Sequence, residues 1–126
     1  EAQWDLGRGD PANAQDIFVM YWWPTYVTPY DFLFNMFHSE ESTLFNLGYY
    51  GNPKFDEMID TANESSGSDK AGAERMFQEA QKMLVDDAAS LFFFDQQNIH
   101  VTREDIEGYV DNPAYSHVVF IYQLSR

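Results

Sequence analysis

Two helix starts in this sequence carry the same signal, a capping residue followed directly by proline. Thr28 and Asn52 are the capping residues, and each is followed by a proline. The side chain of such a cap accepts a hydrogen bond from a free amide of the first turn, and proline at the first helical position has no amide to satisfy. Asp31 adds an acid that favours the positive end of the helix. The signals predict a helix from Thr28 to near His38 and a second helix from Asn52.

A third and longer helix is predicted from Asp69 to about Ala88. Apolar side chains recur there at the spacing that brings them onto one face of a helix, and the two preceding helices show the same spacing. The residues expected on the inner faces are Phe32, Leu33, Met36 and Phe37 in the first helix, Phe55, Met58, Ile59 and Ala62 in the second, and Met76, Phe77, Ala80, Met83 and Leu84 in the third.

The remaining apolar segments have the composition of β-strands. Residues 17–23 are β-branched and aromatic without clear alternation, which is typical of a strand covered on both faces. Three later segments are also predicted as strands: 90–95, 98–102 and 118–124. Gly108 and Pro113 mark turns between them. The predicted fold class is therefore α/β, a mixed sheet with flanking helices.

Charge and composition narrow the classes of function. The 126 residues include 21 Asp and Glu but only 7 Lys and Arg, which gives a formal net charge of −14. Such a chain repels phosphate backbones and anionic lipid surfaces, so nucleic acid is not expected as a partner. No apolar run approaches the roughly 20 residues that cross a bilayer, so we expect no direct membrane insertion of this segment. The hydrophobic residues, 44% of the chain, suffice for one core.

Residue types that carry catalysis or bind metals form no recognisable pattern here. The chain has no cysteine, and its three histidines, His38, His100 and His117, are too far apart in sequence for a short metal-binding motif. Adjacent acidic residues occur, but neighbours in sequence point in different directions on a helix or strand. We find neither a glycine-rich phosphate loop nor a nucleophile elbow. The sequence therefore predicts no enzyme, no catalytic residue, no metal site and no cofactor.

The remaining group of candidate functional residues is aromatic. Residues 21–30 are YWWPTYVTPY, on the connection that leaves the first predicted strand and enters the first helix. Open α/β sheets bind ligands at such strand ends. Aromatic rings supply large contact areas, while hydroxyl groups and the free amides of a helix start add oriented polar contacts. This pattern favours an uncharged or mixed organic ligand, although some of these rings can equally belong to the core.

In three segments the chain resembles the carboxy-terminal part of family 5 solute-binding proteins, the peptide- and nickel-type receptors of ATP-driven importers. The segments are DIFVMYWWPTYVTPYDFLFNMF, YYGNPKFDEMID and AERMFQEAQKMLVDDAASLFFFDQQNIHV. The resemblance covers nearly the whole chain from Asp16 onwards. It implies a periplasmic-binding-protein-like lobe fragment, with residues 1–91 as part of the second lobe. Residues 92–126 would form the crossover and the C-terminal strands that complete the first lobe.

The resemblance also implies a function and partners. Members of this family close two lobes on a ligand without covalent chemistry, and they are several times longer than this chain. The chain is then a fragment of an extracytoplasmic receptor, in the periplasm or at the cell surface. Its expected partners are a small organic ligand, a peptide or an oligosaccharide, and the membrane permease of an ABC importer.

Site residues follow from the same resemblance. Trp22 matches the family's pocket-lining tryptophan, and the other candidate ligand-binding residues are Trp23, Thr25 and Tyr26. In peptide-binding relatives the loop after the tryptophan supplies an acid that pairs with the amino terminus of the peptide. The matching position here is Thr25, which cannot carry that charge. Rings without an acidic anchor suit sugar stacking at least as well as peptide capture, so both ligand classes stay open.

Two other functions compete with the receptor. One is a stand-alone interaction domain that presents its aromatic patch to another protein. The other, less favoured, is a glycan-acting enzyme, which needs an inward-facing pair of Asp or Glu carboxylates a few ångströms apart. The sequence places no such pair.

Overall fold

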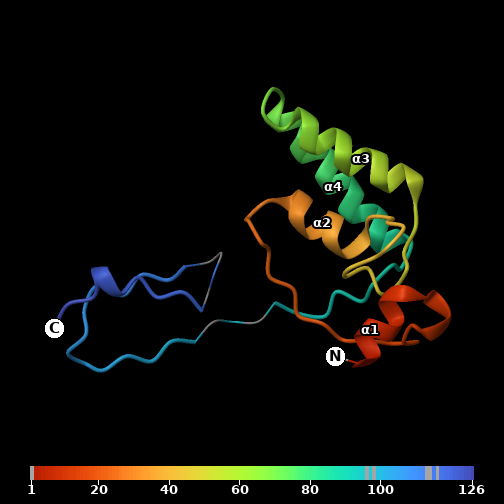
Figure 1. The fold of residues 1–126 in the computed structure, drawn as a ribbon. Coiled ribbons are helices and arrows are strands. Elements are labelled where there is room, and N and C mark those ends of the chain that lie inside the picture. Colours follow the sequence, from red (N-terminus) through yellow and green to blue (C-terminus); the bar gives the residue numbers. More distant parts are fainter. Residues whose placement is uncertain (1, 96, 98, 113–114, 116) are drawn as a thin grey trace. The chain divides into compact units, whose positions relative to one another are not determined.

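The computed structural model describes residues 2–95, 97, 99–112, 115 and 117–126 (Figure 1). Its helical elements, in chain order, are α1 (Ala2–Gly9), η1 (Pro11–Asn13), α2 (Pro29–Phe37), α3 (Pro53–Ser65), α4 (Lys70–Asp86) and η2 (Ile121–Gln123), where η marks a 3-10 helix. The chain divides into two units, Glu1–Leu91 and Phe92–Arg126. None of the described helices has both the length and the apolar character needed to cross a membrane.

Helices α2, α3 and α4 lie together in the first unit (Figure 1). They share one apolar core. Its largest fully buried side chains are Phe55, Ile59 and Leu84. The rest of the core cluster consists of Leu33, Ala62, Ala73, Phe77 and Ala80. Partly buried side chains that pack against it include Phe37, Met58, Met76 and Met83. The predicted inner faces of α3 and α4 are thereby confirmed.

One inner-face prediction in α2 is wrong. The Phe32 side chain is 40% exposed, whereas Leu33 is 5% exposed. Successive residues of a helix point about 100° apart, so the rotation that turns Leu33 toward the core carries Phe32 toward solvent. An apolar residue next to the buried stripe is thus no reliable member of it.

The predicted caps are present at the starts of α2 and α3. The Thr28 hydroxyl oxygen accepts a hydrogen bond from the Asp31 amide at 3.2 Å. The side-chain oxygen of Asn52 accepts from the amides of Lys54 and Phe55 at 3.1 and 3.4 Å. Both helices begin with the proline that follows the cap. Local chemistry alone is enough to fix these two boundaries.

Helix α4 is capped in the same way but ends earlier than predicted. The Asp69 carboxylate accepts from the Gly72 amide at 2.9 Å at its start. At its end Ala88 has φ 50°, in the left-handed region that glycine normally occupies. The Ala89 amide donates to the Leu84 carbonyl oxygen at 3.0 Å and closes the last turn. The helix therefore stops two residues before the predicted end at Ala88.

The predicted mixed sheet is not found among the residues that the structure describes, so the expected α/β fold class is wrong. Their one pairing of strand type is an isolated antiparallel bridge between Glu107 and Ser125, with N–O distances of 3.1 and 3.0 Å. Residues 17–23 form neither helix nor strand, and the same holds for residues 90–95 and 99–102. Residues 118–124 contain the short helix η2 instead of a strand.

A missing backbone partner explains this error. A strand forms only where a neighbouring segment pairs with its amide and carbonyl groups. Preference for strands measures how well side chains suit a pleated, half-buried surface, and it cannot supply the neighbour. In residues 17–23 the side chains of Ile17 and Val19 are 84% and 92% exposed. Asn98, at the start of one predicted strand, and the turn predicted at Pro113 lie outside the described residues.

Ion pairs and a left-handed glycine characterise the second unit. Asp105 accepts hydrogen bonds from Arg103 Nε at 3.0 Å and from Arg126 Nε at 2.6 Å. Gly108 has φ 79°, and a β-carbon there would collide with the carbonyl oxygen of Gln123. This position therefore requires glycine. The assignment of the two units to two lobes of a receptor stays a prediction.

Candidate functional site

The aromatic loop, residues 22–28, leads directly into α2 and contains the four candidate ligand-binding residues. Trp23 is 65% exposed and Tyr26 is 52% exposed. Thr25 is also exposed, and Trp22 is half-buried. The loop thus presents two aromatic side chains to solvent and turns a third toward the interior of the first unit.

Trp22 packs in an aromatic cluster instead of lying on the surface. Its ring meets Phe45 edge-on, with centroids 4.4 Å apart and an interplanar angle of 61°. Trp4 of α1 meets the same Phe45 at 5.7 Å and 77°. The indole nitrogen of Trp22 is shielded from solvent and has no hydrogen-bond partner among the described residues. The environment of Trp22 therefore differs from that of Trp23 and Tyr26.

Asp31 is a functional candidate, although its place in the sequence indicates only an acid that favours a helix start. It is 3% exposed. Its Oδ2 accepts the backbone amide of Thr25 at 2.8 Å, and its Oδ1 lies 3.3 Å from Nδ2 of Asn35. The spacing of Thr28 and Asp31 is that of a capping box, in which the third helical residue reaches back toward the preceding chain. That spacing was the available signal for a link between Asp31 and the loop.

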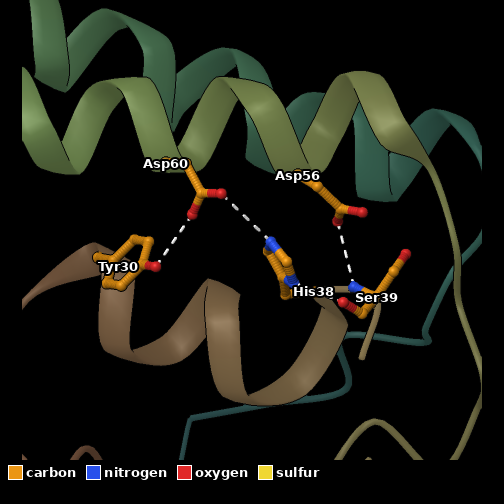
Figure 2. A network of polar contacts seen from close by, with 5 residues as sticks. All are labelled: Tyr30, His38, Ser39, Asp56 and Asp60. Atoms are coloured by element: carbon orange, nitrogen blue, oxygen red, sulfur yellow. Dashed lines mark hydrogen bonds and ion pairs between the residues drawn. The ribbon is translucent and has the colours of Figure 1, made fainter. Parts of the chain in front are cut away.

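A second polar group fixes α2 against α3 (Figure 2). The Tyr30 hydroxyl donates to Oδ1 of Asp60 at 3.0 Å, and Nε2 of His38 lies 3.4 Å from Oδ2 of the same carboxylate. One turn earlier on α3, Asp56 accepts the Ser39 amide at 3.2 Å. Figure 2 shows both carboxylates pointing from α3 toward α2. Both ends of α2 are thus held by one face of α3.

Rings along α2 reinforce this attachment. Phe34 stacks on His38 with centroids 4.5 Å apart, and Tyr30 lies 5.2 Å from Phe34. Burial, and next the hydrogen bond to Asp60, raise the pKa of the Tyr30 phenol well above its ordinary value. The phenol therefore keeps its proton, and its hydrogen bond to Asp60, to a higher pH than a free tyrosine would.

The start of α3 and the end of α4 are joined by a third group. The Tyr50 hydroxyl and Nδ2 of Asn52 donate to Oδ2 of Asp87 at 2.7 and 3.0 Å. Burial, followed by the hydrogen bond to Asp87, raises the pKa of Tyr50 to about 12. The hydrogen bonds from Tyr50 and Asn52 lower the pKa of Asp87. These hydrogen bonds hold α3 against α4, and the Asp87 carboxylate is already occupied by Tyr50 and Asn52.

Metal binding has no structural support in the part of the chain that the structure describes. Those residues contain no group of three or more His, Cys, Asp or Glu side chains that could hold an ion. The arrangement around the aromatic loop offers the exposed rings of Trp23 and Tyr26 and the side-chain hydroxyl groups of Thr25 and Tyr26. It can bind an organic molecule by stacking and hydrogen bonding.

Comparison with known proteins gives one significant relative. Over 122 residues the chain is 30% identical to the "Probable D,D-dipeptide-binding periplasmic protein DdpA" of Escherichia coli (strain K12). The aligned region is 96% of this chain and 22% of that protein. The match supports a fragment of the family 5 solute-binding proteins. No family model and no solved structure matches the sequence significantly.

The match to a solute-binding protein confirms the resemblance seen in the sequence. The relative is a periplasmic protein by name, which also confirms the extracytoplasmic location that the resemblance implied. Its name describes binding and no reaction. The chain spans only about a fifth of that relative, as the 22% coverage shows.

Proposed function

We propose that this chain is a fragment of a non-catalytic receptor that captures a small peptide outside the cytoplasm and passes it to the permease of an ABC importer. The observation that carries the proposal is the 30% identity over 122 residues to a dipeptide-binding periplasmic protein. An alignment of that length includes the aromatic loop and helices α2, α3 and α4. Closure of two lobes around the ligand is the mechanism that the family implies.

A peptide is the favoured ligand class. The relative is named for D,D-dipeptides, and none of the comparisons supports an oligosaccharide. Trp22, Trp23, Thr25 and Tyr26 are the proposed ligand-binding residues. Among them the exposed rings of Trp23 and Tyr26 are the surfaces best placed for direct contact. Thr25 carries no charge, so anchoring of a peptide ammonium group by an acid at this position does not carry over.

A calorimetric screen of the full-length protein tests the proposal. The probes are D-alanyl-D-alanine, L-alanyl-L-alanine and the disaccharide cellobiose. We expect the D,D-dipeptide to bind and to remain intact. At a hundredfold excess over Kd, a ligand that binds only the folded state stabilises it by about 2.7 kcal/mol, which a thermal scan detects. Binding of cellobiose alone would contradict the peptide assignment, and turnover of a probe would contradict a receptor without catalysis.

One observation favours an interaction domain as the second candidate. Apolar side chains before the aromatic loop are open to solvent, with Ile17 and Val19 more than four-fifths exposed. Light scattering after size exclusion distinguishes the two functions. A receptor fragment needs no second copy, whereas a self-associating interaction domain gives a mass that rises with concentration.

A further inference from the structure

Asp31 belongs to α2 but its carboxylate reaches back into the aromatic loop. Oδ2 accepts the amide of Thr25, six residues earlier, at 2.8 Å. On the other side, Nδ2 of Asn35 lies 3.3 Å from Oδ1 and 2.7 Å from the Asp31 carbonyl oxygen. Both carboxylate oxygens therefore have a partner, and one of these partners lies in the loop. At 3% exposure, Asp31 is too buried to meet a ligand itself.

Two further hydrogen bonds tighten the loop around this contact. The Asp31 amide donates to the Thr28 hydroxyl oxygen at 3.2 Å, and the Thr28 amide donates to the Tyr26 carbonyl oxygen at 2.8 Å. In an ordinary capping box the carboxyl group of the third helical residue accepts the amide of the cap. Here Tyr26 takes that amide, so the Asp31 carboxylate accepts Thr25 instead. Three residues of the loop are thereby fixed to the start of the helix.

The helix that carries Asp31 is itself fixed. Asp60 of α3 accepts from Tyr30, next to Asp31, and also faces His38 at the other end of α2 (Figure 2). Because these contacts hold α2 on α3, a movement of Thr25 away from α2 requires loss of its hydrogen bond to Asp31. The hydrogen bond between Asp31 and Thr25 therefore connects the loop to a helix that is itself held in place.

We propose that Asp31 is the positioning residue of the ligand site, and this rests on the proposed function. It does not touch the ligand. By holding the Thr25 backbone it presents the exposed rings of Trp23 and Tyr26 in one arrangement before the ligand arrives. A loop that is ordered in advance loses less conformational freedom on binding, and affinity rises accordingly.

The first part of the test needs no ligand. Amide hydrogen exchange of the full-length protein is followed at Thr25 by NMR, in the wild type and in Asp31→Ala and Asp31→Asn. In Asp31→Ala we expect exchange at Thr25 to be about tenfold faster or more, because the amide loses its acceptor. Asp31→Asn keeps one side-chain oxygen as acceptor, so its rate stays near that of the wild type. Amides inside α3 keep their rates in both variants.

Asp69→Ala is the matched control. Asp69 caps α4 through the Gly72 amide at 2.9 Å, and it makes no contact with the aromatic loop in the hydrogen bonds that the structure describes. Its loss removes the N-cap of α4, and the loss of Asp31 removes an acid from the first turn of α2, so both variants lose stability at a helix start. If Thr25 is ordered specifically by Asp31, Asp69→Ala leaves amide exchange at Thr25 unchanged.

The second part measures the affinity for D-alanyl-D-alanine by calorimetry. We expect Asp31→Ala to weaken binding about tenfold, Asp31→Asn to restore most of it and Asp69→Ala to leave it unchanged. Thr25 exchange within about twofold of wild type in Asp31→Ala overturns the inference, and so does an equal acceleration in Asp69→Ala. If the wild type binds no probe, the proposed function fails, while exchange at Thr25 still decides whether Asp31 orders the loop.

Discussion

Helices α2–α4 and residues 17–23 are both rich in large apolar side chains, yet only the helices bury them. Phe55 and Ile59 are fully buried, whereas Ile17 and Val19 are 84% and 92% exposed. A helix satisfies its backbone hydrogen bonds internally and needs a cover for one face only. An extended segment also needs a neighbour for its backbone. Apolar composition therefore does not determine structure until the backbone partner is known.

One substitution to alanine in each region tests this comparison, and the substitution in the helical core has the largest expected effect. Phe55→Ala removes a ring from the centre of the core and should lower the free energy of unfolding by about 3–5 kcal/mol. Val19→Ala, in the exposed segment, should change it by less than about 0.5 kcal/mol. Urea denaturation followed by circular dichroism measures both. A similar loss for the two variants would show that residues 17–23 are buried in solution.

The two neighbouring tryptophans extend the comparison into the candidate site. Trp22→Ala should lower the free energy of unfolding by about 2 kcal/mol, because a half-buried ring leaves its contact with Phe45. Trp23→Ala should leave folding stability unchanged and weaken D-alanyl-D-alanine binding by about 1–3 kcal/mol. Denaturation and calorimetry on the same samples separate the two effects. Loss of affinity in Trp22→Ala with full stability would assign the stacking surface to Trp22 instead.

The bond between Tyr50 and Asp87 makes the stability of the helical region depend on pH at both extremes. The pKa of Tyr50 is raised from 10.0 to about 12, so its contribution is complete below pH 10 and is lost as the pH rises toward 12. The pKa of Asp87 is lowered from 3.8, so its contribution is present above that value and is lost as the pH falls through the lower one. Melting temperatures across this range measure both effects.

Tyr50→Phe is the control for this pH dependence. It keeps the ring next to Phe55 but cannot donate to Asp87. The decrease in stability above pH 10 should be smaller in the variant than in the wild type. An identical alkaline profile would show that other groups cause the decrease.

The smallest expected effect concerns the end of α4. Ala88 has φ 50°, a conformation that glycine adopts at no steric cost. Ala88→Gly should therefore stabilise the protein by about 0.5–1 kcal/mol. Gln78→Gly, at an exposed position inside the same helix, should destabilise it by about 1 kcal/mol. Destabilisation by both variants would mean that the helix continues past Ala88 in solution.

Local chemistry explains what could be predicted from the sequence. Thr28 and Asn52 mark the helix starts because a cap and its amides lie within three residues. The buried faces of α3 and α4 follow from helical periodicity. The error at Phe32 is of the same local kind, a neighbour of the buried stripe taken as a member of it.

Contacts between distant residues explain what could not be predicted. The prediction of a sheet was wrong because strand pairing depends on a partner segment that composition does not specify. Asp60 contacts Tyr30 and His38, which precede it by 30 and 22 positions in the sequence. No local sequence pattern indicates these contacts. The aromatic loop was found from its residue types, but the difference in exposure between Trp22 and Trp23 comes from Phe45, which is more than twenty positions away. Only Asp31 left a readable signal, the capping-box spacing from Thr28.

Asp31 accepts its hydrogen bond from the main-chain amide of Thr25 and not from the Thr25 side chain. Every amino acid except proline offers the same N–H group, so the anchor is indifferent to what position 25 displays. The side chain at position 25 can therefore change in evolution, for example to an acid or an amide, and alter the ligand preference while the hydrogen bond to Asp31 is kept. Variation of the ligand contact and conservation of the loop conformation are thus compatible within a few residues.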